Sequence, residues 1–307
     1  MTYSAGNTIL AADLNSFISD VEDIFGDNNS GSTAAGALIF GYGESMLQAD
    51  VSAGNTITAA QWNNLWMMVH RCAGHQGSTV NIGGSVSAGP WSAGDAITID
   101  SNIAADIATI RTNKLNFSAG NMTTANCNAK SGTATWGTTG SSTCVHNYTQ
   151  TFASYDAARH FHNQGGATLF TFSRSGGSSN AQNTAWTDLG TAVGTVTVGV
   201  NTTTQSGGGG TTGDSFDDVV GNAGTTRTIF TQASSGSYAS NNYKIECSCN
   251  TAKEVFTWTV TFTDGHTNSF FDQVDGTLAS TAQDRRATGT YINSAAPSYS
   301  AGSFTQS

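Results

Sequence analysis

Apolar residues in the first third of the chain recur at helical spacing. The first such stretch predicts a helix over Ala11–Phe25, which Gly26 stops. In the second stretch, Thr58 and Gln61 have the form of a capping box, and Gly74 is the expected end of the helix. The apolar faces of these two predicted helices include Leu14, Phe17, Ile18, Val21, Trp62, Leu65, Trp66 and Val69.

A short motif precedes each helical stretch. Tyr3–Ile9 recurs as Val51–Ile57 and again as Trp91–Ile97, and a partial copy follows at Phe117–Asn121. The shared core is Ser-Ala-Gly followed by Asn or Asp, and the third copy leads into an apolar pattern that begins at Ile103. The spacing between copies is irregular. The pattern therefore predicts an array of degenerate units, each an extended entry, a turn and a helix.

Helices of three or four turns are marginal by themselves in water. They must pack on one another or on neighbouring subunits. We therefore predict that the eight apolar residues named above form an assembly interface, to which Trp62 and Trp66 contribute the largest surface.

After Thr143 the apolar period changes from helical spacing to two. Glu254–Phe262 is the strongest strand pattern, and Val193–Val198, Arg227–Phe230 and Tyr243–Cys247 are further strands. We predict an α+β protein. Residues 1–130 form the array of turn-and-helix repeats, and residues 131–307 form an all-β, antiparallel sandwich-like domain.

Composition narrows the function classes. Glycine accounts for 36 of 307 residues, charged residues for 10%, and the net charge is −10. So few basic residues argue against nucleic-acid binding, and so few ionisable groups are unusual for an enzyme. No apolar run of about 20 residues and no signal peptide is evident, so we expect synthesis in a cytoplasm and no membrane insertion. Five cysteines, an odd number, do not indicate a disulfide framework.

Four groups of residues could carry chemistry, and each has a structural alternative that we favour. His160 and His162 could begin a metal site if they lie on one strand face. Cys247 and Cys249 could bind metal or close a strained disulfide, although no second pair with zinc spacing is present, and Cys127 and Cys144 could form a bridge. The third and fourth groups are the aspartates Asp264, Asp272 and Asp275, with Asp214, Asp217 and Asp218 elsewhere, and the tyrosines Tyr238, Tyr243, Tyr291 and Tyr299.

The aspartates could be calcium ligands or glycosidase acids, and the tyrosines could stack on sugars. No calcium loop, phosphate loop or nucleophile elbow is present. We predict no catalytic residues, no cofactor and no metal site.

Several segments resemble virion structural, tail-fibre-like proteins of tailed phages that infect marine cyanobacteria and other aquatic bacteria. The resemblance covers most of the chain and rests on the Ser-Ala-Gly repeats and on the segments 158–166, 173–177, 182–186, 262–264, 272–278, 285–289 and 297–299. Two features depart from the family pattern: His160 and His162 stand where aromatic residues are common, and Gln273 replaces an acid. The resemblance also implies that the aspartates make turns and buried hydrogen bonds near Arg285 and Arg286.

The expected function is that of a non-enzymatic virion protein. We expect a subunit of a fibre or fibre-like appendage that binds copies of itself and other virion proteins. A trimer is expected by analogy with other fibres. Lysis of the host cell would release the protein. Three alternatives remain open: a capsid decoration or vertex protein, an adhesin module for host-surface glycans, and an extracellular protein that forms filaments or tubes. A polysaccharide depolymerase is the least expected.

Overall fold

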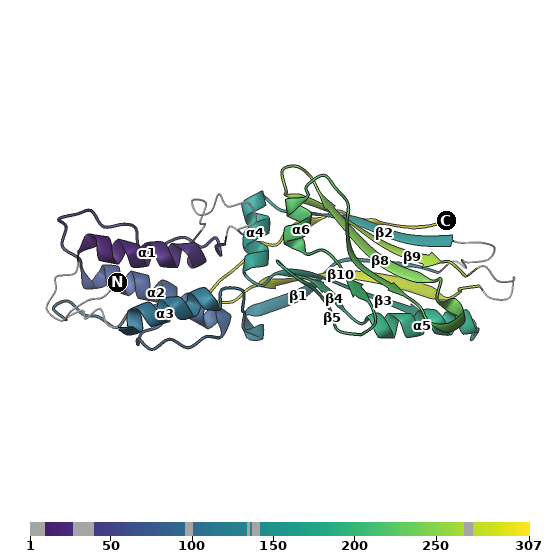
Figure 1. Ribbon diagram of the computed structural model, residues 1–307, viewed down its shortest axis with the longest axis horizontal. Coiled ribbons are helices and arrows are strands. Elements are labelled where there is room, and N and C mark those ends of the chain that lie inside the picture. Colours follow the sequence, from purple (N-terminus) through teal and green to yellow (C-terminus); the bar gives the residue numbers. More distant parts are fainter. Residues whose placement is uncertain (1–9, 27–39, 96–100, 134–135, 137–141, 267–272) are drawn as a thin grey trace. The chain divides into compact units, whose positions relative to one another are not determined.

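The chain combines helices with two antiparallel sheets (Figure 1). The computed structural model describes residues 10–26, 40–95, 101–133, 136, 142–266 and 273–307. The first motif copy, most of the Gly26–Gly43 connector and Asp272 lie outside the described residues.

The chain divides into two compact units that are not contiguous in sequence. Unit 1 comprises Met1–Thr123, Arg159–Gly165 and Arg286–Ser294. Unit 2 comprises Thr124–Ala158, Gly166–Arg285 and Ala295–Ser307. The single boundary that we expected near residue 130 therefore misses two later segments, which return to the N-terminal unit.

Of the described α-helices, α1, α2, α3 and the second half of α4 (Tyr155–Asn163) lie in unit 1. α1 spans Ala11–Phe25, as predicted, and α3 spans Ser101–Thr112. α2 spans Ala59–Gln76 and begins with the predicted capping box, in which the Thr58 backbone N–H donates to Gln61 Oε1. It does not stop at Gly74. It continues to Gly77, whose φ of 71° is the left-handed conformation that closes many helices.

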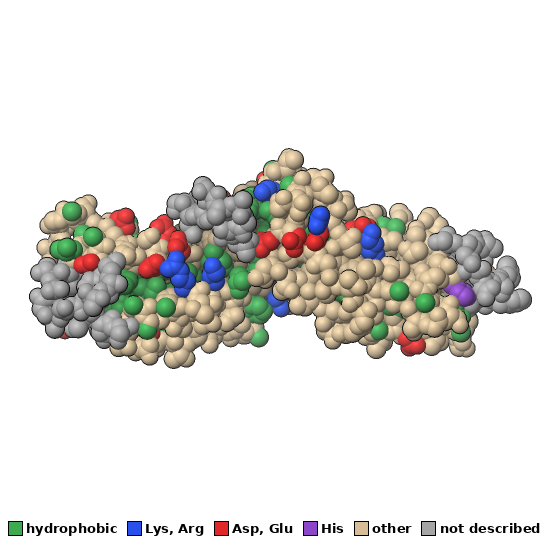
Figure 2. Space-filling model, in the orientation of Figure 1, with side chains coloured by type: hydrophobic (Ala, Val, Ile, Leu, Met, Phe, Trp, Pro, Cys, Tyr) green, Lys and Arg blue, Asp and Glu red, His purple; other side chains and the backbone are tan. Residues whose placement is uncertain are grey.

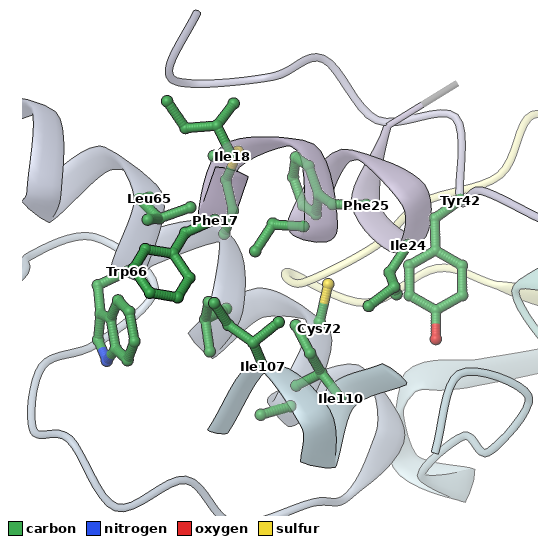
Figure 3. Close-up of a cluster of buried hydrophobic side chains, with 14 of the residues drawn as sticks. Phe17, Ile18, Ile24, Phe25, Tyr42, Leu65, Trp66, Cys72, Ile107 and Ile110 are labelled. Atoms are coloured by element: carbon green, nitrogen blue, oxygen red, sulfur yellow. The ribbon is translucent and has the colours of Figure 1, made fainter. Parts of the chain in front are cut away.

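The core of unit 1 lies between these helices (Figure 3). Helices α1 and α2 contribute most of the buried side chains, and α3 adds Ile103, Ile107 and Ile110. The late segment of the chain supplies Ala287 and Ile292 to the same core. Because each helix is only a few turns long, this shared burial is what holds the helices folded.

Unit 2 contains two antiparallel sheets, except that the start of β1 and the end of β10 belong to unit 1. The five-stranded sheet has the order β1-β10-β3-β4-β5. Its strands are β1 Met122–Gly132, β10 Thr277–Ala287, β3 Ala167–Ser175, β4 Val196–Val198 and β5 Thr203–Gln205. The seven-stranded sheet has the order β11-β2-β9-β8-β7-β6, with β12 also paired to β2. Its strands are β2 Ser142–Thr151, β6 Thr211–Thr212, β7 Arg227–Ala233, β8 Asn242–Cys249, β9 Val255–Asp264, β11 Ser298–Tyr299 and β12 Ser303–Gln306.

The strongest strand prediction is confirmed. In β9 the side chains of Phe256, Trp258, Val260 and Phe262 are buried and alternate with more exposed threonines. β9 pairs with β2 on one side and β8 on the other.

Side chains from the two sheets contact one another in the interior of unit 2. The ring centroids of Phe172 on β3 and Tyr243 on β8 are 4.6 Å apart, and those of Phe170 on β3 and Trp258 on β9 are 5.0 Å apart. Aromatic pairs at such distances contribute beyond the area that they bury.

Two parts of the fold prediction are wrong. The C-terminal part is not all-β, because it contains α4 Tyr155–Asn163, α5 Ala181–Val193 and α6 Phe216–Gly221. Val193 ends α5, so the strand predicted from that residue is limited to β4. In addition, β1 is a strand inside the region expected to hold repeats. Short turns η1 Ala119–Asn121 and η2 Gly236–Tyr238 complete the elements.

Candidate functional site

The eight residues predicted as an assembly interface lie inside unit 1. Each is at most 7% exposed, and Trp62, Trp66 and Leu65 are fully buried. Phe17 contacts Trp62, and Trp91 covers both Trp62 and Trp66. Intramolecular packing thus occupies this apolar surface, which leaves it unavailable to another chain.

Two asparagines connect the helices to the Ser-Ala-Gly segments. Asn15 on α1 donates to the Val51 carbonyl at 3.0 Å and accepts from the Val51 N–H at 2.8 Å. Asn63 on α2 does the same with Trp91, at 2.8 and 3.0 Å. Val51 and Trp91 begin the second and third motif copies. After each of them, a turn closes with a hydrogen bond from the Asn or Asp N–H to the Ser carbonyl.

The segment Arg159–Gly165 attaches to the backbone around Tyr42. Arg159 donates to the Phe40 carbonyl, Asn163 to the Gly41 carbonyl and Gln164 to the Tyr42 carbonyl. Consecutive carbonyls are thus satisfied by buried side chains from one short segment. This part of the family-like sequence therefore has a structural role, which is to complete unit 1.

The two histidines of that segment do not share a face. His160 and His162 lie on α4, where residues two apart point in different directions. His162 is buried and its ring contacts Phe161. The strand on which the metal hypothesis depended is absent. Among the described residues, no group of three His, Cys, Asp or Glu side chains is arranged to hold a metal ion.

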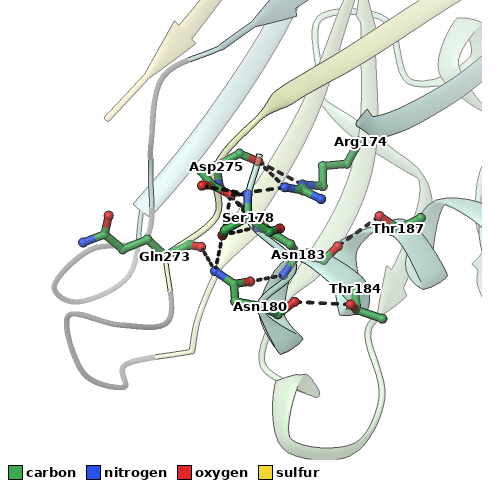
Figure 4. Close-up of polar contacts among 8 residues, drawn as sticks. All are labelled: Arg174, Ser178, Asn180, Asn183, Thr184, Thr187, Gln273 and Asp275. Carbon is green, nitrogen blue, oxygen red and sulfur yellow. Dashed lines mark hydrogen bonds and ion pairs between the residues drawn. The ribbon is translucent and has the colours of Figure 1, made fainter. Parts of the chain in front are cut away.

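Asp275 holds the start of α5 against the end of β3 (Figure 4). Its carboxylate accepts hydrogen bonds from the Ser178 N–H, the Ser178 hydroxyl and Asn183 Nδ2. Arg174 donates to the Asp275 carbonyl at 2.9 and 2.6 Å and forms an ion pair with its carboxylate. The Asn183 and Ser178 hydrogen bonds lower the pKa of Asp275. Its cationic partner is thus Arg174, where the resemblance implied Arg285 or Arg286.

The other expected polar sites are also structural. Asp264 accepts from Gln182 Nε2 at 2.5 Å inside unit 2. All five cysteines are free thiols. Cys247 and Cys249 share the buried face of β8, and burial raises the pKa of both. Burial likewise raises the pKa of Cys127 and Cys144 to about 12, so these thiols stay protonated and unreactive.

Sequence reasoning missed a seam of buried polar side chains between the sheets. His146 on β2 lies 2.9 Å from the Ser280 hydroxyl on β10 and 3.0 Å from Asn128 Oδ1 on β1. A serine, a histidine and an asparagine in a chain of hydrogen bonds is a nucleophile arrangement. However, His146 is fully buried and Ser280 is 1% exposed, so substrate has no access to the hydroxyl. Burial lowers the pKa of His146 to about 4.

A second part of this seam lies further along the same strand. Gln150 on β2 accepts at Oε1 from the Trp258 indole N–H at 3.1 Å and from the Thr168 hydroxyl at 3.4 Å. Thr168 belongs to β3, so the contact links the two sheets. Asp284 lies opposite Thr168 in the pairing of β10 with β3. All four side chains are at most 3% exposed.

Unit 1 has a hollow that a small molecule could enter. Its volume is about 400 Å³, and its lining includes His70, Ser78, Thr79, Val80 and Tyr291. The Tyr291 ring lies against Gly74 of α2 so closely that a Cβ there would come within 2.7 Å of a ring atom. Of the four tyrosines considered for sugar stacking, Tyr291 lines this hollow, whereas Tyr243 is fully buried.

The surface offers one long strand edge. β1 has 11 residues and ends the order of the five-stranded sheet, and Thr123 to Asn126 are exposed. The other terminal strands of the two sheets, as described, have two to four residues. On the face shown in Figure 2, acidic and basic side chains are scattered over a larger area that is neither charged nor hydrophobic. Lys130 is the one charged residue of β1, and a strand edge of this length can pair with another chain.

Comparison with models of known protein families, with curated proteins and with solved structures found no match. Among the described residues, no helix has both the length and the apolar character that crossing a bilayer requires. The function is therefore argued from the residues themselves.

Proposed function

We propose that the chain is a structural subunit of a tailed-phage particle, a fibre or fibre-like appendage that assembles through strand pairing. The observation that carries this proposal is β1, an 11-residue strand at the end of its sheet whose residues Thr123–Asn126 are exposed. Backbone N–H and C=O groups at such an edge are satisfied by water or by a strand from another molecule.

The arrangement of polar groups supports a mechanical function. The buried polar residues of unit 2 tie strands to strands, and the Asp275 cluster fixes the start of a helix. These groups are used to hold the fold together. The low charge and the Ser-, Thr- and Gly-rich surface fit a protein that meets neighbours over large uncharged areas.

Two finer features of the fold belong to the same proposal. We take unit 2 to be a β-sandwich decorated with helices, because aromatic side chains from both sheets meet in its interior. We take unit 1 to be a folded array of turn-and-helix repeats, because Asn15 and Asn63 make the same paired contact with the start of a motif copy.

The partner that we propose for β1 is β1 of a second copy. Two identical edges that pair about a twofold axis give a dimer or a multiple of two. The trimer expected by analogy would require a different contact. Measurement of the molar mass by light scattering on a sizing column distinguishes the two arrangements.

An Ala125→Lys variant tests the edge. Ala125 is exposed near the middle of β1, so pairing of two copies would bring two added ammonium groups close together. We expect a wild-type oligomer, a smaller species for Ala125→Lys, and wild-type size for Ala125→Ser, all with the same circular dichroism. A wild-type monomer at every concentration would contradict the proposal, as would an Ala125→Lys oligomer of unchanged size. Locating the chain in a map of an intact particle would test the virion assignment.

The hollow beside Tyr291 favours a second function, the binding of a surface glycan. The hollow places an aromatic ring beside hydroxyl side chains and a histidine. A sugar could stack its CH groups on the ring and direct its hydroxyls to the polar side chains. A glycan-array measurement tests it with Tyr291→Ala against Tyr291→Phe. Binding that Ala abolishes and Phe retains would support this function, and no binding by the wild type would exclude it.

A further inference from the structure

Gln150 and Thr168 bring an amide carbonyl and a hydroxyl together in a place that water does not reach. The Thr168 hydroxyl is 3.4 Å from Gln150 Oε1, and the two residues are 0% and 1% exposed. The Gln150 Nε2 group has no partner in hydrogen-bonding geometry among the described residues, although the Gln150 side chain lies near enough to the Tyr299 hydroxyl to oppose the rise in the pKa of that group. Burying an amide nitrogen that makes no hydrogen bond costs free energy. A single hydrogen bond between Thr168 and Gln150 therefore does not account for this arrangement.

Two neighbours supply what acyl transfer needs. The Trp258 indole N–H donates to Gln150 Oε1 at 3.1 Å and would stabilise negative charge that develops on this oxygen. Asp284 is the direct cross-strand partner of Thr168, so both side chains are on the same face of the sheet. A buried carboxylate in this position can take the proton of the hydroxyl.

We propose that Thr168 and Gln150 form an intramolecular ester, so that this pair is a self-modification site that covalently joins the two sheets. The Thr168 oxygen adds to Cδ of Gln150. Its proton passes through the Asp284 carboxylate to the amide nitrogen, the C–N bond breaks and ammonia leaves. One C–O bond replaces one C–N bond, with no oxidant or reductant.

The surroundings favour the ester once it has formed. Burial excludes the water that would hydrolyse it, and loss of ammonia removes the Nε2 group that lacks a partner. The nearby thiol does not compete, because burial and then Asp284 raise the pKa of Cys127 to about 12. The bond would connect β2 of the seven-stranded sheet with β3 of the five-stranded sheet, and so would resist forces that pull the sheets apart. This inference stands whether or not the chain belongs to a virion.

Trypsin provides a direct test on the full-length protein. It cleaves after Lys130, Arg159 and Arg174, so Gln150 falls in peptide 131–159 and Thr168 in peptide 160–174. After digestion of the denatured wild-type chain, we expect the two peptides as one linked species, lighter than their sum by one ammonia. Hydroxylamine should separate them. Recovery of the two peptides apart and unmodified would overturn the proposal.

Three variants define the chemistry. Thr168→Ser keeps a hydroxyl and should stay linked, whereas Thr168→Val keeps the shape without the hydroxyl and should lose the link entirely. Cyclisation of an asparagine also releases ammonia. That loss of mass would persist in Thr168→Val, and it would not link the two peptides. Asp284→Asn should slow linkage after synthesis, and an unchanged rate would remove Asp284 from the mechanism. The wild-type result decides the proposal even if a variant fails to fold.

Discussion

The side chain of Asn63 pairs with both backbone groups of Trp91, as a neighbouring strand would. Nδ2 donates to the Trp91 carbonyl and Oδ1 accepts from the Trp91 N–H. A carboxamide is suited to this because it carries donors and an acceptor on one rigid group. Since the Trp91 ring covers Trp62 and Trp66, this pairing places the residue that closes one side of the unit 1 core.

Replacing Asn63 with Ala should therefore destabilise unit 1 by about 1–3 kcal/mol, because two partly buried backbone groups lose their partner. Asn63→Asp should also destabilise it, since a carboxylate accepts from the N–H but cannot donate to the carbonyl. Denaturant unfolding followed by tryptophan fluorescence measures the change. Asn64→Ala is the control, because among the described residues the Asn64 side chain makes a single hydrogen bond, of 3.4 Å, to Gln48. Equal loss in both variants would show that the pairing has no special role.

Trp66→Ala distinguishes a core residue from an interface residue. Trp66 is fully buried within its own chain, so we expect a loss of about 3–5 kcal/mol in the stability of unit 1. Our initial prediction, that Trp66 binds another copy, requires instead a smaller oligomer with a stable subunit. Unfolding at several protein concentrations separates the two outcomes. A stable Trp66→Ala chain of reduced oligomer size would restore the interface prediction.

The helices of unit 1 were predictable because each carries a regular apolar stripe and a recognisable cap. α5 was not, because Trp186, Leu189 and Val193 are diluted by Thr, Asn and Gly residues that are typical of loops. Its start is visible in hindsight, since Asn180 accepts from the Asn183 N–H as a helix cap.

The buried polar seam had a misleading pattern. His146 and Gln150 share the buried face of β2 with Cys144 and Tyr148, whereas polar residues at period two normally indicate the exposed face. The attachment of Arg159 to the Phe40 carbonyl joins residues 119 apart, and no local signal indicates such a pairing. The predicted fold thus differs from the observed one at polar residues that are buried although no pattern in the sequence indicates their burial.

His75 and His146 should make the protein sensitive to acid. Burial lowers the pKa of each from 6.5 to about 4, so the folded state keeps both neutral while the unfolded chain takes up protons. Stability should be fully present above pH 6.5 and fall as the pH drops from 6.5 to 4. Each residue contributes up to about 3 kcal/mol to this loss. Denaturant unfolding at fixed pH values measures the slope.

The controls use the same two positions. His75→Gln and His146→Gln remove the titrating groups, so the variants should be less stable at neutral pH but lose less stability between pH 6.5 and 4. His70, which is partly exposed in α2, serves as a matched replacement. If His70→Gln reduced the pH dependence of stability as much as His75→Gln does, this explanation would be contradicted.

Asp217 and Asp218 are adjacent, yet their replacement by Asn should have opposite effects. Burial, and then the charge of Asp218, raises the pKa of Asp217 to about 7, and its Oδ2 has no hydrogen-bond partner among the described residues. The folded state therefore holds a proton there that the unfolded chain releases above pH 4, and stability falls as the pH rises toward 7. Asp217→Asn should remove this loss, so it should be more stable than the wild type at pH 8 and equal to it near pH 3.

Asp218 has the reverse chemistry. It accepts from the Ser215 N–H and hydroxyl, which lower its pKa, so its charged form stabilises the fold at any pH above its unfolded value. Asp218→Asn should therefore be less stable than the wild type at pH 8, and the difference should shrink as acid protonates the carboxylate. Thermal unfolding of both variants at pH 3 and pH 8 measures the four values. Shifts of the same sign at pH 8 would mean that burial and hydrogen bonding do not separate these two carboxylates.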